Sequence, residues 1–163
     1  MPLPELNGAL PAIGQPAPEL RFVGVDREKD DLKSLRGQVV VLLAFPSLDT
    51  GVCAIETRKF NQLAVGLGAT ILVVSVDTPF AMKRFCIAEG IENVRMGSDF
   101  RFHDLFRNWG VGILEGPLEG ATARAVWVLD RDGVVRYVEL VPEIGNEPDY
   151  DAVLKATKNL VEA

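Results

Sequence analysis

The two cysteines, Cys53 and Cys86, are the residues of this sequence best suited to covalent chemistry. Cys53 follows a β-favouring run and a short loop, and it lies where an amphipathic helix is expected to begin. Unpaired N–H groups and the helix dipole stabilise a thiolate at such a position. Arg58 could add positive charge, and the hydroxyl of Thr50 could orient a bound oxygen. Because a thiolate is the reactive form of cysteine, we predict that Cys53 is a nucleophile.

Each cysteine also has a simpler interpretation. Most free cysteines are small buried hydrophobes, and this description could apply to Cys53. Cys86 lies on a different predicted helix between the apolar residues Phe85 and Ile87. From its neighbours alone, Cys86 is better explained as a core residue than as a reactive one.

Other familiar sites lack the residues that they need. His103 is the only histidine, and a metal site with both cysteines would take ligands from three elements without a close-spaced pair. No hydrolase elbow accompanies Cys53, which argues against a Cys–His hydrolase. The run 130–133, Asp-Arg-Asp-Gly, resembles part of a calcium loop but lacks the remaining ligands, so we interpret it as a hairpin turn. With no glycine-rich phosphate loop either, we expect no metal and no cofactor.

The elements that must position these residues alternate along the chain. Apolar, β-favouring runs predict strands at 39–45, 70–76, near Val94, 123–129 and 134–140. Helical periodicity and start signals predict helices at 53–67, 80–88, 104–109 and 150–161. This order predicts an α/β sandwich in which helices flank a central mixed β-sheet, as in a thioredoxin-like fold.

Length and composition restrict the class of protein. The 163 residues predict a single domain over 1–163, with a proline-rich, extended lead-in at 1–19. A net charge of −6 without a basic patch argues against partners such as nucleic acid or an anionic membrane. The start of the chain has no signal-peptide pattern, and the longest apolar run, 39–45, is too short to span a membrane. We therefore expect a cytoplasmic protein, in which a cysteine pair favours redox chemistry over a static disulfide.

The sequence around Cys53 is similar to a known signature. Pro46, Thr50 and Cys53 match the pattern Pro-x-x-x-Thr/Ser-x-x-Cys of the peroxiredoxins. The longer string at 45–60, FPSLDTGVCAIETRKF, resembles the thiol peroxidases, which are atypical 2-Cys peroxiredoxins of bacteria. Further blocks of resemblance lie, in order, at 79–93, 116–130 and 139–150. The resemblance covers nearly all of the chain after Ile13 and implies the peroxiredoxin form of the thioredoxin-like sandwich.

The resemblance implies a role for each matching residue at the first cysteine. Cys53 would be the peroxidatic cysteine, which attacks hydrogen peroxide or an organic (alkyl) hydroperoxide and becomes a sulfenic acid. Thr50 would bind the substrate, Pro46 would shield the thiolate from water, and Arg124 would stabilise the thiolate and the leaving oxygen. Phe45 would add apolar surface for an alkyl hydroperoxide. Alone, Arg124 could be a surface residue, but its apolar neighbours favour a partly buried role.

The resemblance assigns Cys86 as the resolving cysteine. Cys86 would form an intramolecular disulfide with Cys53, and a thioredoxin-type dithiol would reduce it in an antioxidant cycle. Because a disulfide requires a close approach of its two Cα atoms, we expect both cysteine-bearing helices to loosen in each cycle. One departure is Ile87, since relatives usually carry glycine after the resolving cysteine. A stiffer helix at Ile87 would slow formation of the disulfide.

The resemblance also implies a homodimer, with residues 46–51 and 110–120 near the partner. Six apolar residues could contribute to that surface, although a core role explains each of them equally well: Phe45, Leu48, Trp109, Ile113, Leu114 and Leu118. A thioredoxin-fold binding or holdase protein without catalysis is the alternative to an enzyme. A binding protein needs none of the matching residues, so their joint presence argues against it.

Overall fold

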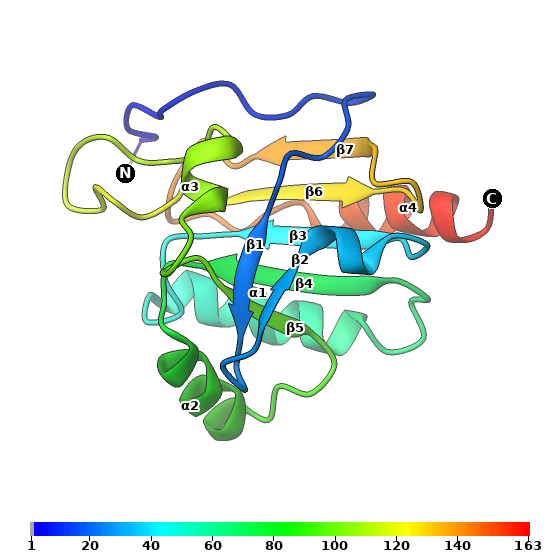
Figure 1. Cartoon of the computed structure of the whole chain (residues 1–163), viewed down its shortest axis with the longest axis horizontal. Helices are drawn as coiled ribbons and strands as arrows, with labels where there is room; N and C mark the ends of the chain where they lie inside the picture. Colours follow the sequence, from blue (N-terminus) through cyan, green and yellow to red (C-terminus); the bar gives the residue numbers. More distant parts are fainter. Residues whose placement is uncertain (1) are drawn as a thin grey trace.

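The computed structural model describes residues 2–163, which are organised around one seven-stranded sheet (Figure 1). The strand order is β2-β1-β5-β4-β3-β6-β7. The three central strands β3, β4 and β5 are parallel, and the remaining pairs are antiparallel. The sheet is therefore mixed, as predicted, and its strands are β1 Arg21–Gly24, β2 Lys29–Asp31, β3 Val40–Ala44, β4 Thr70–Ser75, β5 Arg95–Ser98, β6 Ala125–Leu129 and β7 Val135–Leu140.

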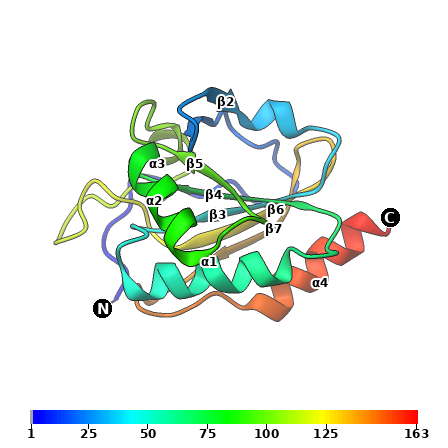
Figure 2. The same cartoon turned by 90° about the horizontal axis from the view of Figure 1, so that it is seen from below.

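Helices cover the sheet on both faces. Helices α1 and α4 lie together on one face, where the rings of Phe60 and Tyr150 are 5.2 Å apart, and a short 3-10 helix, η1, lies on the other (Figure 2). The elements are α1 Gly51–Leu63, α2 Pro79–Glu89, α3 Asp104–Asn108, α4 Tyr150–Val161 and η1 Leu32–Leu35. Helix α1 begins before the predicted start because Thr50 caps it. Cys53 therefore lies inside the first turn of α1, not at its start.

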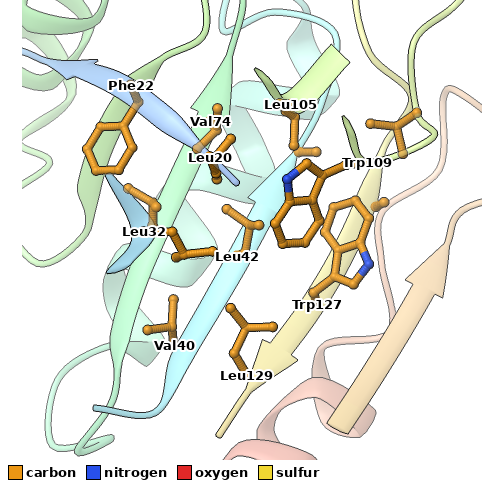
Figure 3. Close-up of a cluster of buried hydrophobic side chains, with 14 of the residues drawn as sticks. Leu20, Phe22, Leu32, Val40, Leu42, Val74, Leu105, Trp109, Trp127 and Leu129 are labelled. Atoms are coloured by element: carbon orange, nitrogen blue, oxygen red, sulfur yellow. The ribbon is translucent and has the colours of Figure 1, made fainter. Parts of the chain in front are cut away.

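Strand β3 separates two apolar cores. Val41 and Leu43 pack on the face of the sheet that α1 and α4 cover (the helix face), whereas Val40, Leu42 and Ala44 belong to the cluster on the opposite face. This alternation is the period of two that a strand imposes on its side chains. In the opposite cluster, the two tryptophans Trp109 and Trp127 meet edge to face with centroids 4.9 Å apart (Figure 3). The prediction of a strand buried on both faces is confirmed.

The N-terminal third contains elements that the sequence analysis did not predict. Strands β1 and β2 have four and three residues, and β2 reads Lys-Asp-Asp, without an apolar pattern. Residues 2–19 form only isolated bridges, among them Leu6 with Ile113 and Pro16 with Val134. The proline-rich lead-in is thus extended and is held against other loops by backbone hydrogen bonds.

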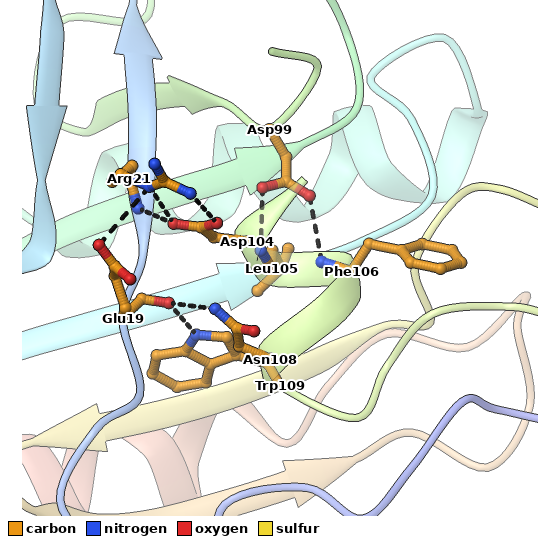
Figure 4. Close-up of polar contacts among 8 residues, drawn as sticks. All are labelled: Glu19, Arg21, Asp99, Asp104, Leu105, Phe106, Asn108 and Trp109. Atoms are coloured by element: carbon orange, nitrogen blue, oxygen red, sulfur yellow. Dashed lines mark hydrogen bonds and ion pairs between the residues drawn. The ribbon is translucent and has the colours of Figure 1, made fainter. Parts of the chain in front are cut away.

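Ion pairs and caps anchor the segment around α3 to β1 (Figure 4). The Asp99 carboxylate accepts hydrogen bonds from the backbone N–H groups of Leu105 and Phe106, at 2.9 and 3.1 Å. Burial raises the pKa of Asp99 to about 6. The Arg21 guanidinium donates two hydrogen bonds to the Asp104 carboxylate, at 2.8 and 2.9 Å, and the Arg21 backbone N–H donates a third at 2.9 Å. These contacts hold α3 against the sheet and keep the following tryptophan in the core.

Candidate active site

Cys53 is held in the first turn of α1 by the cap that starts the helix. The Thr50 hydroxyl oxygen accepts a hydrogen bond from the N–H of Cys53 at 3.4 Å, and the hydroxyl donates to the carbonyl of Ser47 at 3.1 Å. Cys53 is 0% exposed and packs in the core on the helix face. Its thiol therefore lies near the positive end of α1, shielded from bulk solvent.

The loop between β3 and α1 is fixed by Asp77, which follows β4. The Asp77 carboxylate accepts from the hydroxyl of Ser47 at 2.7 Å and from the N–H of Leu48 at 2.8 Å. Phe45 and Pro46, at the start of the loop, are both buried. The loop is thus anchored to Asp77, and Phe45 packs in the same core cluster as Cys53.

Arg124 lies immediately before β6, far from Cys53 in the sequence, and its side chain contacts Cys53. Its Nη2 donates to the Cys53 Sγ at 3.3 Å and to the carbonyl of Ile144 at 3.1 Å, and its Nη1 donates to Glu56 Oε2 at 2.6 Å. Burial alone would lower the pKa of Arg124, but attraction to Cys53 and Glu56 raises it above its usual value. A permanent positive charge, 1% exposed, thus lies against the sulfur.

Glu56 is a buried member of this cluster that the sequence analysis missed. It is 0% exposed, and its Oε1 has no hydrogen-bond partner among the described residues. Burial, which outweighs the attraction of Arg124, raises the pKa of Glu56 to about 7. Residues three apart on a helix share a face, so the spacing from Cys53 could have identified it.

Cys86 lies on α2 and is not bonded to Cys53. It is half-buried against the core on the helix face, and burial raises the pKa of its thiol. Arg58, which could have supplied charge to Cys53, instead forms an ion pair with Glu89 of α2 at 3.2 Å. Arg58 therefore connects the two cysteine-bearing helices.

Most of the apolar residues considered for a partner surface fill the core. Phe45, Leu48, Trp109 and Ile113 are all buried, whereas Leu114 is 43% exposed. For these four buried residues, the core interpretation applies.

Neither a metal-ligand cluster nor a membrane-spanning helix is found among the described residues 2–163. No group of three or more histidine, cysteine, aspartate or glutamate residues there could hold a metal ion. His103 instead precedes α3 with a left-handed φ of 58° and makes no side-chain cap. In the same part of the chain, no helix combines the length and apolar character required to cross a membrane.

Comparisons with known proteins identify the family of the chain. The Redoxin family model matches residues 12–154. A thiol peroxidase of Leptospira interrogans is 48% identical to this chain, and the alignment covers 93% of this chain and 91% of the relative. A thiol peroxidase of Mycobacterium tuberculosis is 51% identical, and the alignment covers 91% of this chain and 90% of the relative.

Solved structures give the same result. A peroxiredoxin-like protein from Aquifex aeolicus superposes with a TM-score of 0.90 at 46% identity, covering 95% of this chain and 91% of that one. A thiol peroxidase from Chromobacterium violaceum superposes with a TM-score of 0.86 at 25% identity, covering 94% and 90%. The chain belongs to the redoxin family and, within it, to the thiol peroxidases of the peroxiredoxin type.

Proposed function

We propose that this peroxidase reduces hydrogen peroxide and organic hydroperoxides to water and alcohols through a sulfenic acid on Cys53. The observation that carries the proposal is the buried contact of 3.3 Å between Arg124 Nη2 and the Cys53 sulfur. A guanidinium at this distance stabilises a thiolate and the negative charge that develops on a departing oxygen.

In the first step, the Cys53 thiolate attacks the terminal oxygen of the hydroperoxide. The sulfur–oxygen bond forms as the oxygen–oxygen bond breaks, so sulfur is oxidised and the peroxide is reduced. The departing hydroxide or alkoxide takes a proton from water and leaves as water or alcohol. Thr50, the N-cap of α1 whose hydroxyl contacts the N–H of Cys53, would orient the peroxide, and the buried Pro46 and Phe45 would limit access of water.

In the second step, the sulfur of Cys86 attacks the sulfenic acid, forms a disulfide with Cys53 and releases water. The two cysteines lie on separate helices joined by the Arg58–Glu89 ion pair, so α1 and α2 must loosen before the sulfurs meet. A thioredoxin-type dithiol then reduces the disulfide by thiol–disulfide exchange and is itself oxidised. The cycle would serve antioxidant defence in the cytoplasm, by a homodimer with residues 46–51 and 110–120 near the partner.

The decisive experiment traps the oxidised cysteine. Reduced Cys86→Ser protein is treated with one equivalent of hydrogen peroxide and then with dimedone, and the adduct is located by peptide mass spectrometry. We expect a single adduct on Cys53, whereas the wild-type protein should form a Cys53–Cys86 disulfide without an adduct. Cys53→Ser serves as the matched control and should take up no oxygen at a cysteine. An adduct elsewhere, or oxygen uptake that persists in the control, contradicts the proposal.

Turnover is measured separately with thioredoxin, thioredoxin reductase and NADPH. The wild-type protein should consume NADPH in proportion to added peroxide. If Cys86→Ser retains full turnover, another thiol resolves the sulfenic acid and the second step is wrong.

Thr50→Val should impair both the reaction and the start of α1. Valine preserves the shape of threonine but removes the oxygen that caps Cys53 and the hydroxyl that would orient the peroxide. We expect the rate constant for oxidation of Cys53 to fall about a hundredfold and the free energy of unfolding to fall by about 1 kcal/mol. Stopped-flow oxidation and urea unfolding measure the two effects. Thr50→Ser, which keeps the hydroxyl, should remain close to wild type, and equal losses in both variants would exclude the hydroxyl role.

Ile87→Gly should speed formation of the disulfide. The side chain of Ile87 is 74% exposed, so glycine acts here mainly by weakening α2 and not by opening the core. A difference in helix propensity of about 0.5 kcal/mol corresponds to roughly a twofold faster step. The rate of disulfide formation after a peroxide pulse measures the effect. Ile87→Ala is the control with a good helix former, and a rate as high as that of glycine would remove the explanation.

A further inference from the structure

The connection from β7 to α4, residues 141–149 (Figure 1), contacts the Arg124 guanidinium through the backbone carbonyl of Ile144. The carbonyl of Ile144 accepts a hydrogen bond from Arg124 Nη2 at 3.1 Å, and the same nitrogen donates to the Cys53 sulfur at 3.3 Å. The direction in which this nitrogen points therefore depends on where the 141–149 loop lies.

Two contacts fix the ends of the 141–149 loop. At its start, the N–H of Val141 donates to the carbonyl of Arg124 at 3.0 Å. At its end, the N–H of Asp149 donates to both carboxylate oxygens of Glu139, at 3.0 and 3.3 Å. The Glu139 carboxylate also accepts from the hydroxyl of Tyr137 at 2.7 Å, which holds it along β7. One side chain thus bridges two positions that are ten apart in the sequence, Glu139 and Asp149.

We propose that Glu139 is a positioning residue for the peroxidase reaction, which holds the 141–149 loop so that Ile144 directs Arg124 toward Cys53. This inference rests on the proposed roles of Cys53 and Arg124. Glu139 does not touch the sulfur, and it acts through the loop backbone and the guanidinium. A shift of about 1 Å in a group that orients the reacting atoms can lower a rate by about a hundredfold. A small movement of the 141–149 loop could therefore slow the reaction, although Glu139 does not touch the sulfur.

Glu139 could instead act through its charge. Its carboxylate, like that of Glu147, helps to raise the pKa of Glu56, the buried partner of Arg124. Tyr137 and Asp149 are the other titratable groups in contact with Glu139. A test must therefore separate the reach of the side chain from its charge.

Two conservative variants make this separation. Glu139→Gln removes the charge but keeps an oxygen at the same reach for the Asp149 N–H. Glu139→Asp keeps the charge but shortens the side chain by one methylene, so the carboxylate no longer spans to Asp149. We expect Glu139→Asp to lower the rate constant for hydrogen peroxide about tenfold and to move the rising limb of its pH profile to higher pH. Glu139→Gln should stay within about threefold of wild type, with its pH profile preserved.

If Glu139→Gln lowers the rate constant and Glu139→Asp does not, the charge of Glu139 matters and its reach does not. That result would overturn the proposal. Two variants that both match wild type would overturn it as well. Glu92→Gln, at an exposed position, is the charge-matched control and should match wild type. A wild-type protein that shows no oxidation of Cys53 would instead refute the proposed function, so the two failures are distinguishable.

Discussion

Arg124→Met is expected to lower the rate constant for oxidation of Cys53 by hydrogen peroxide about a thousandfold. Removing one preorganised donor at a developing charge typically costs a factor of a hundred to a thousand. Arg124 gives one such donor to the Cys53 sulfur at 3.3 Å and also carries a full positive charge in a buried site. Competition against a reference peroxidase or stopped-flow fluorescence, at pH 7 with one peroxide equivalent, measures the rate constant.

The control must account for Glu56, which loses its partner when Arg124 is replaced. The Arg124→Met variant is therefore compared in a Glu56→Gln background, in which no buried carboxylate is left unpaired. We expect the same thousandfold loss in both backgrounds because the loss arises at the sulfur. A loss that disappears in the Glu56→Gln background would show that Arg124 mainly neutralises Glu56, and the catalytic role would be wrong.

Glu56→Ala is expected to lower the free energy of unfolding by about 3–5 kcal/mol at pH 8, above the pKa of about 7, where the Glu56 carboxylate is mostly ionised and pairs with Arg124. Breaking a buried ion pair on one side leaves the other charge without compensation, and a loss of this size is typical. Here Arg124 Nη1 would lose its contact of 2.6 Å, while the guanidinium stays 1% exposed. Urea unfolding of the reduced protein measures the loss. Glu56→Gln keeps an acceptor oxygen and should lose clearly less, so equal losses in both variants would contradict the pairing argument.

Glu56 also makes stability depend on pH. In the folded protein its pKa is about 7, above the ordinary value of 4.5 that applies to the unfolded chain. Between these values the folded protein holds a proton that the unfolded chain has released, so the free energy of unfolding falls as pH rises. The fall amounts to about 3 kcal/mol over this range.

Glu56→Gln removes this titration, so its stability relative to wild type should rise by that amount between pH 4.5 and 7. Stability curves that stay parallel across this range would contradict the assigned pKa.

The fold was predictable where the sequence pattern is strong. The continuous apolar run at β3 can only be buried on both faces, and the threonine and proline at the start of α2 mark a helix start. Strands β1 and β2 carry no such pattern. Strands β1 and β2 form a local hairpin, but β2 has no apolar residue to signal it. The pairing of β1 with β5 depends on contacts between distant segments, which local preferences do not contain.

The candidate site divides in the same way. Thr50 and Cys53 are close in the sequence, so a helix cap at Thr50 could have predicted their contact, although the helix was expected to begin at Cys53. The contact between Arg124 and Cys53 spans 71 residues and was expected only from the family resemblance. The pairing of Arg58 with Glu89 was not predicted, because a solvent-facing arginine can pair with any of several carboxylates. Which carboxylate lies within reach depends on how α1 packs against α2.

Burial of Cys86 has a consequence for tolerance of high peroxide doses. Because its pKa is raised, Cys86 stays protonated at neutral pH, and a protonated thiol reacts poorly with peroxide. Excess oxidant would therefore spare Cys86 and fall on Cys53. In the proposed cycle the same burial would delay capture of the sulfenic acid until α2 loosens, and a second peroxide would then have time to carry Cys53 to the irreversible sulfinic acid. In the proposed cycle, the half-buried resolving thiol would thus set the peroxide concentration above which the enzyme is inactivated by its own substrate.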